Sequence, residues 1–163
     1  MQKSKRHFRR FFHALVIFLW IALMLLIYWF SDQPDTVSSQ QSMQIGKLIC
    51  SILVNGYDAL SEVTQNQYVE MIDHFVRKTA HFCEYAVLGI LTLESFRVMK
   101  IGKLQGLAWM WCIFYAATDE YHQLFIPGRY GMVKDVVLDS LGALTGILLC
   151  IWVRERFLKY DTN

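Results

Sequence analysis

The chain has 163 residues, of which 55% are hydrophobic, and its formal net charge is +2. The apolar residues are gathered in long uncharged blocks. This argues against an ordinary water-soluble domain and favours a membrane protein of about four spans, because each span takes roughly 20 residues. The four cysteines lie far apart without a CxxC pair, so neither a disulfide framework nor a zinc ribbon is expected.

The first apolar block follows a basic segment at residues 3–10 and runs from 14 to 30 without a charge. A signal peptide has a similar order, but this apolar run is longer than a usual signal-peptide core and no small-residue cleavage site follows it. We therefore predict an uncleaved first transmembrane helix, preceded by a cytoplasmic basic tail at residues 1–13. Tyr28 and Trp29 are expected at the far membrane interface.

The segment after this span changes character twice. Residues 31–42, SDQPDTVSSQQS, are predicted to be a linker, because Pro34 and the dense Ser, Gln and Asp residues disfavour a helix. Apolar residues then recur at helical spacing from Ile45 to Val63, with a break expected near Asn55-Gly56. This spacing predicts an amphipathic helix that lies on the membrane or caps the bundle. The alternative is a small helical hairpin that faces solvent.

Three further apolar segments predict spans at about 79–97, 104–124 and 134–153, joined by short turns. The fold class predicted from the four spans is therefore an all-α polytopic membrane protein with an additional external amphipathic helical segment. Its transmembrane domain would cover residues 14–153.

The distribution of Lys and Arg predicts the topology, because cytoplasmic loops carry an excess of these residues. With the N-terminus in the cytoplasm, eleven of the sixteen basic residues lie on the inner side and five on the outer side. Both termini are therefore expected in the cytoplasm. Residues 154–163 would form the C-terminal tail, and residues 31–78 would form an external loop.

This topology brings three groups of polar residues to the outer leaflet. They are Arg77, Lys78, His81, Glu84 and Tyr85 in the second span, Asp119, Glu120, His122 and Gln123 in the third, and Arg129, Lys134, Asp135 and Asp139 in the last loop and the fourth span. Asp135 and Asp139 share one helical stripe with two glycines, Gly142 and Gly146. Glycines let a neighbouring helix approach closely in lipid, so these carboxylates should face the bundle interior. The near balance of acidic and basic residues predicts a paired network.

Two functions are compatible with these clusters, beside a buried salt-bridge network that only fixes the helix register. In an enzyme acting on a lipid headgroup or a wall precursor, His81 or His122 would be the general base, oriented by Glu84 or Asp139. In a binding module, basic residues such as Arg129 would hold a phosphate or carboxylate.

No cofactor or metal is expected, because the chain has no Gly-rich phosphate loop, no GxSxG motif and no HExxH motif. A divalent cation would have His81, Glu84 and His122 as its candidate ligands. The basic N-terminus is followed at once by a span, which fits anionic lipid rather than nucleic acid. Membrane lipids are therefore the expected partners.

Three blocks of the chain resemble the signature blocks of the VanZ-like membrane proteins in order and spacing. They are KTAHFCEYAVLG at 78–89, TDEYHQLFIPGRYG at 118–131 and KDVVLDSLGALTG at 134–146. The resemblance covers about residues 14–153. It implies a multi-pass protein of the bacterial cell membrane that affects susceptibility to the glycopeptide teicoplanin by binding or modifying an outer-leaflet lipid or wall component. A glycopeptide or a wall precursor then joins the membrane lipids among the expected partners.

The family's polar pattern falls on the three clusters described above, and the chemistry of these residues gives the candidates. The catalytic candidates are His81, Glu84, His122, Asp135 and Asp139. The ligand-binding candidates are Lys78, Tyr85, Asp119, Glu120, Gln123 and Arg129. The family often has Asn where Asp139 stands, so this chain adds a charge there. The resemblance assigns no catalytic role to any of these residues, and a membrane-embedded enzyme with His and carboxylate acid–base chemistry stays as the alternative function.

Overall fold

The computed structural model describes residues 2–102 and 104–158, and this part of the chain is helical without a strand. The elements are α1 (Gln2–Ser31), α2 (Asp35–Leu53), the 3-10 turn η1 (Tyr57–Ala59), α3 (Glu62–Val98), α4 (Leu104–Gln123), α5 (Val133–Val153) and the π-helical turn η2 (Arg154–Leu158). The predicted all-α class is confirmed. Lys103 in the predicted inner turn, and residues 159–163 of the predicted C-terminal tail, lie outside the described residues.

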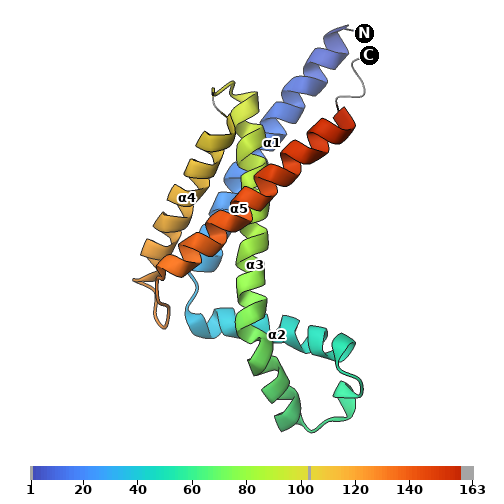
Figure 1. The fold of residues 1–163 in the computed structure, drawn as a ribbon, viewed down its shortest axis with the longest axis vertical. Coiled ribbons are helices and arrows are strands. Elements are labelled where there is room, and N and C mark those ends of the chain that lie inside the picture. Colours follow the sequence, from blue (N-terminus) through green and yellow to red (C-terminus); the bar gives the residue numbers. More distant parts are fainter. Residues whose placement is uncertain (1, 103, 159–163) are drawn as a thin grey trace.

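Four helical segments pack side by side as a bundle: α1, the second half of α3, α4 and α5 (Figure 1). The helix α3 is 37 residues long, so its first half projects beyond the bundle, where it packs against α2. The first turns of α1 and the last turns of α5 lie at the same end of the bundle, and α2 lies at the other end (Figure 1). The projecting part formed by α2, η1 and the first half of α3 is called the hairpin below.

Two helical segments, Arg6–Ser31 and Val133–Phe157, are long and apolar enough to cross a bilayer by length and composition. At about 1.5 Å per residue, both exceed the roughly 30 Å thickness of the hydrocarbon layer. They contain the first and fourth predicted spans. The second and third predicted spans are helical, but they are less apolar because ionisable side chains such as Glu84 and Asp119 interrupt them.

The predicted linker at residues 31–42 is wrong, because α2 already begins at Asp35. Pro34 precedes the first turn, where a proline costs no helical hydrogen bond, and Asp35 places a negative charge at the positive end of the helix dipole. The Ser-rich face of α2 then packs on α3: Ser42 is buried, and its hydroxyl donates to a carboxylate oxygen of Asp73. Tertiary contacts therefore make a helix of a segment whose composition predicts a linker.

The predicted break near Asn55-Gly56 is confirmed. The helix α2 ends at Leu53, and Gly56 adopts a left-handed conformation with φ 76° that suits glycine. The small residues Gly46 and Cys50 face α3 and are buried. The larger apolar residues of α2 face outward instead, with Ile45 51% and Ile52 72% exposed. The helix is thus amphipathic as predicted, and its outward apolar face is largely exposed.

Glycines bring α3 and α5 into close contact, as the stripe on the fourth predicted span indicates. A Cβ built on Gly146 would overlap the backbone carbonyl of Ala86, and one built on Gly142 would overlap that of Phe82. From the other side, Gly89 of α3 meets Ala143 of α5 in the same way. Such backbone approach is typical of helix pairs in lipid.

Polar side chains within the bundle fasten α1 to its neighbours. The indole nitrogen of Trp20 donates to the hydroxyl of Thr92 on α3 at 2.9 Å, and the Tyr115 hydroxyl of α4 donates to the Met24 carbonyl at 2.5 Å. Between these bonds lies an apolar core that includes Ile27, Leu88, Cys112, Ala116 and Ala143. This packing holds the helices in fixed positions relative to one another. It therefore also sets the positions of the polar side chains at the end of the bundle that faces the hairpin.

Candidate functional site

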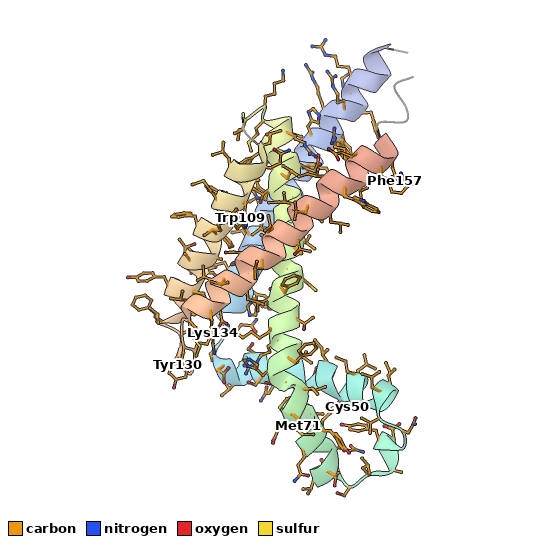
Figure 2. All side chains as sticks on the ribbon, viewed as in Figure 1. Cys50, Met71, Trp109, Tyr130, Lys134 and Phe157 are labelled. Carbon is orange, nitrogen blue, oxygen red and sulfur yellow. The ribbon has the colours of Figure 1, made fainter. Side chains whose placement is uncertain are left out.

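A polar pocket of about 170 Å³ opens where α2, α3, α4 and α5 meet, at the end of the bundle that faces the hairpin. It is lined by Asp35, Ser38, His74, Arg77, Lys78, His81, Glu120, Gln123, Gly128, Arg129, Tyr130, Met132, Lys134, Asp135 and Asp139. Tyr130 and Lys134 lie at this end of the bundle, close to the start of α2 (Figure 2). All three predicted polar clusters contribute to this pocket.

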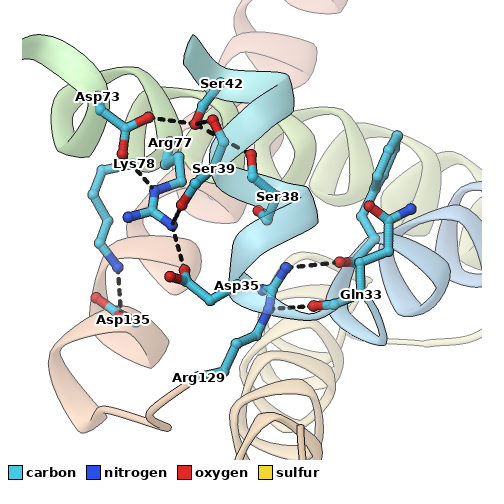
Figure 3. A network of polar contacts seen from close by, with 11 residues as sticks. Gln33, Asp35, Ser38, Ser39, Ser42, Asp73, Arg77, Lys78, Arg129 and Asp135 are labelled. Atoms are coloured by element: carbon cyan, nitrogen blue, oxygen red, sulfur yellow. Dashed lines mark hydrogen bonds and ion pairs between the residues drawn. The ribbon is translucent and has the colours of Figure 1, made fainter. Parts of the chain in front are cut away.

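Ion pairs between different helices form one wall of the pocket (Figure 3). Lys78 of α3 contacts Asp135 of α5, with Nζ 2.5 Å from Oδ2. Arg77 contacts Asp35 of α2, with its Nη1 2.6 Å from Oδ1, and also a carboxylate of its own helix, with its Nε 3.2 Å from Oδ2 of Asp73. Of the predicted network, the Lys78–Asp135 pair is present, whereas Arg77 pairs with two carboxylates that the sequence reasoning did not include. All of these side chains keep some exposure, so solvent weakens each pair.

Carboxyl groups lie below these ion pairs, deeper in the bundle. Asp139 lines the pocket but is only 1% exposed, and its Oδ1 has no hydrogen-bond partner among the described residues. Asp119 is also buried, with one oxygen near the Gln123 amide at 3.4 Å and the other without a described partner. Glu120 accepts from the Met132 backbone N–H at 2.9 Å. The buried Tyr85 hydroxyl likewise has no partner in the described structure.

Arg129 reaches from the α4–α5 loop to the end of α1 (Figure 3). Its Nε donates to the Gln33 carbonyl at 2.8 Å and its Nη2 to the Phe30 carbonyl at 2.9 Å. These carbonyls belong to the last turn of α1 and the turn to α2, where helical partners run out. Burial lowers the pKa of the Arg129 guanidinium, but from so high an ordinary value that the group stays charged at neutral pH. Arg129 thus lines the pocket and also fixes its α1 side.

The two candidate histidines occupy different places. His81 lines the pocket, and its buried Nδ1 lies 3.8 Å from Oε2 of Glu84, too far for a hydrogen bond. His122 points toward α1 instead: its Nε2 lies 3.0 Å from Oδ1 of Asp32, and its ring packs on Tyr28. His122 is not among the residues that line the pocket.

The candidate metal ligands are therefore not brought together. Within residues 2–102 and 104–158, no three His, Cys, Asp or Glu side chains form a group that could hold a metal ion. His81 and Glu84 lie near each other on α3, whereas His122 contacts α1.

Of the remaining candidates, Lys78, Glu120, Gln123, Arg129, Asp135 and Asp139 line the pocket together with His81. The sequence reasoning missed Asp35, Ser38 and Asp73. The position of Asp73, one turn before Arg77 on the same helix face, could have indicated an i,i+4 pair. Asp35 and Ser38 were hidden by the predicted linker.

The two bilayer-length helices of the bundle, taken together with the family match that follows, indicate a membrane protein. The chain matches the sequence model of the VanZ/LLP1 family over residues 16–154, and it belongs to this family. The match confirms the resemblance seen in the three sequence blocks. No curated protein and no solved structure matches the chain.

Proposed function

We propose that the chain is a cell-envelope protein whose polar pocket binds a polar component of the outer leaflet, either a lipid or a wall component, and thereby changes susceptibility to glycopeptides such as teicoplanin. The observation that carries this proposal is the pocket itself, where charged groups of both signs from four helices and the α4–α5 loop converge. A site of this kind suits a ligand with several polar groups better than it suits a single ion.

The proposed orientation has four spans, formed by α1, the second half of α3, α4 and α5, with both termini in the cytoplasm. Two features support it. The first turns of α1 and the last turns of α5 lie at the same end of the bundle, as an even number of antiparallel spans requires (Figure 1). Among the residues that the structure describes, the same end carries most of the Lys and Arg residues, in agreement with the positive-inside rule. The pocket then lies at the outer leaflet.

The hairpin is proposed to rest on the outer membrane surface rather than to stand free in solvent. The outward residues Leu48 and Leu53 of α2, and Met71 and Phe75 of α3, are all exposed. An apolar face without protein contacts next to a bilayer is stabilised by insertion at the interface.

The orientation predicts which side of the membrane can label two engineered cysteines. Tyr130→Cys in the α4–α5 loop should react with a membrane-impermeant maleimide added to intact cells. Gly102→Cys in the α3–α4 turn should react only after the inner face is opened. Both positions are exposed, and both variants should carry Cys83→Ala, because Cys83 is the exposed native cysteine. Labelling of Gly102→Cys in intact cells would rule out the proposed orientation.

The functional test compares Lys78→Gln with Lys47→Gln, a matched control on the exposed surface of α2. If the pocket binds the envelope component, Lys78→Gln should return teicoplanin susceptibility to that of cells without the protein, at normal protein level. The control should behave as the unchanged chain. A charge swap, Lys78→Asp with Asp135→Lys, restores an ion pair but not the native charge arrangement. Full function in the swap would show that the pair only holds the helices together.

A second candidate function is supported by the position of His81. Its Nδ1 has no hydrogen-bond partner among the described residues, and it lines the same pocket as Asp139. A histidine in this state can accept a proton from a bound substrate, which is the role of a general base. Lipid and wall-precursor profiles with the unchanged chain and with His81→Gln distinguish the two functions. A new molecular species that His81→Gln abolishes would indicate catalysis, and unchanged profiles with retained binding of the drug would indicate binding alone.

A further inference from the structure

A second hollow of about 160 Å³ adjoins the polar pocket, between the end of α1, α2 and α3. The two hollows share four lining residues, Ser38, Arg77, His81 and Arg129. Because the same side chains line both, they form adjacent parts of one depression. We call the second hollow the groove.

The groove differs in character from the pocket. Away from the shared residues its lining includes the polar Gln41, Ser42 and Glu84, but four of the seven residues are apolar: Phe30 of α1, Ile45 of α2, and Val76 and Ala80 of α3. These side chains offer an apolar surface, and Ile45 belongs to the outward apolar face of α2. A molecule that fills both hollows therefore needs a polar head and a hydrocarbon tail.

The polar pocket also restricts the chemistry of that head. Arg77 and Lys78 already contact carboxylates. Asp139 is buried with one oxygen unpartnered, and that oxygen can only accept a hydrogen bond while the group is ionised. Lys134 lines the same pocket and forms no ion pair with any described residue. A headgroup that fits this pocket therefore has a cationic group that donates a hydrogen bond to Asp139. It also has an anionic group that lies near Lys134.

We propose that the pocket and the groove together bind one bilayer phospholipid whose headgroup contains both a phosphate and an ammonium group. The ammonium would donate to Asp139, the phosphate would lie near Lys134, and one acyl chain would run along the groove past Ala80. This inference rests on the proposed function, in that the pocket binds an outer-leaflet component, and it names the class of that component.

The test measures lipid binding to the full chain in mild detergent by native mass spectrometry. The probes are phosphatidylethanolamine and phosphatidylglycerol with the same acyl chains, of which the second lacks the ammonium. Phosphatidylethanolamine should bind at least about tenfold tighter, the difference expected from one well-placed charged hydrogen bond. Asp139→Asn should remove this preference. Lys134→Gln, at an exposed position where the fold is not at risk, should weaken binding of both lipids.

The groove is tested by Ala80→Trp, which should fill it and weaken phosphatidylethanolamine binding. Ala117→Trp, at an exposed position of α4 outside both hollows, is the matched control and should leave binding unchanged. Equal binding by the two Trp variants would overturn the acyl-chain part of the proposal. Equal affinity of the two lipids for the unchanged chain would overturn the headgroup part.

Lipid binding and drug susceptibility are separate measurements, so the two proposals can fail separately. If neither lipid binds while Lys78→Gln still alters teicoplanin susceptibility, the phospholipid inference is wrong and the proposed function stands. If phosphatidylethanolamine binds as expected while Lys78→Gln leaves susceptibility unchanged, the proposed function is wrong and the lipid site stands.

Discussion

Gly146→Ala should destabilise the folded chain strongly, although it adds only one methyl group. The new Cβ would overlap the carbonyl oxygen of Ala86, a backbone atom of α3 that cannot rotate away as a side chain can. Overpacking of this kind lowers the free energy of unfolding by about 1–3 kcal/mol. Because the neighbouring backbone is rigid, we expect a loss toward the upper end of this range. The expected result is a lower melting temperature in mild detergent, followed through the fluorescence of the five tryptophans.

Gly106→Ala is the matched control for this prediction. Gly106 also lies within a helix, but a Cβ built there meets no atom within 4 Å. Alanine favours a helix over glycine by about 0.5–1 kcal/mol, so this variant should be as stable as the unchanged chain or slightly more stable. If Gly146→Ala were as stable as Gly106→Ala, the close approach of α3 and α5 would be wrong, and with it the positions of Asp135 and Asp139.

The extent of the bundle helices could be predicted from the sequence because their signals are local. The apolar runs predict α5 nearly to both ends, but α1 only at its C-terminal end, because α1 begins at Gln2 and most of the predicted basic tail is helical. The first part of α2, up to the predicted start of the amphipathic helix at Ile45, was missed because its stability depends on a partner. Its serines suit a linker by composition, and only contact with α3, such as that of Ser42 with Asp73, favours the helix. That contact joins residues 31 positions apart, and no local pattern reveals it.

The candidate site was predictable where helical spacing governs it and not where packing does. Residues on one face of α3 or α5, such as Lys78 and Asp139, do line the same pocket. His122 lies between Glu120 and Gln123, which line the pocket, yet it contacts Tyr28 of α1 and Asp32 just after α1. Whether a residue of α4 faces the pocket or α1 depends on which helix packs on each side of α4. Helical periodicity in the sequence does not reveal which helices are neighbours.

Arg129→Lys should loosen the α1–α2 turn even though it keeps the positive charge. The guanidinium donates from two nitrogens to two carbonyls, those of Phe30 and Gln33. A lysine has one nitrogen on a flexible stem and cannot reproduce this fork. Hydrogen bonds from a charged donor contribute about 1.5–3 kcal/mol, and the partial exposure of Arg129 puts the lost bond at the lower end. Amide hydrogen exchange should rise in the turn and in the first residues of α2.

The same loop holds α2 through a second contact, which makes the location of this effect specific. The backbone N–H of Asp35 donates to the Pro127 carbonyl at 3.3 Å, and Gly128 leaves room for the Asp35 side chain. When Arg129 is replaced, amide hydrogen exchange should therefore rise both in the loop and at the start of α2. The amides near Gly146, where α3 contacts α5, should stay protected from exchange. Arg156→Lys, at an exposed position of η2, supplies the control and should change exchange nowhere. Unchanged exchange at residues 30–40 in Arg129→Lys would mean that this arginine serves the pocket ligand alone and not the fold.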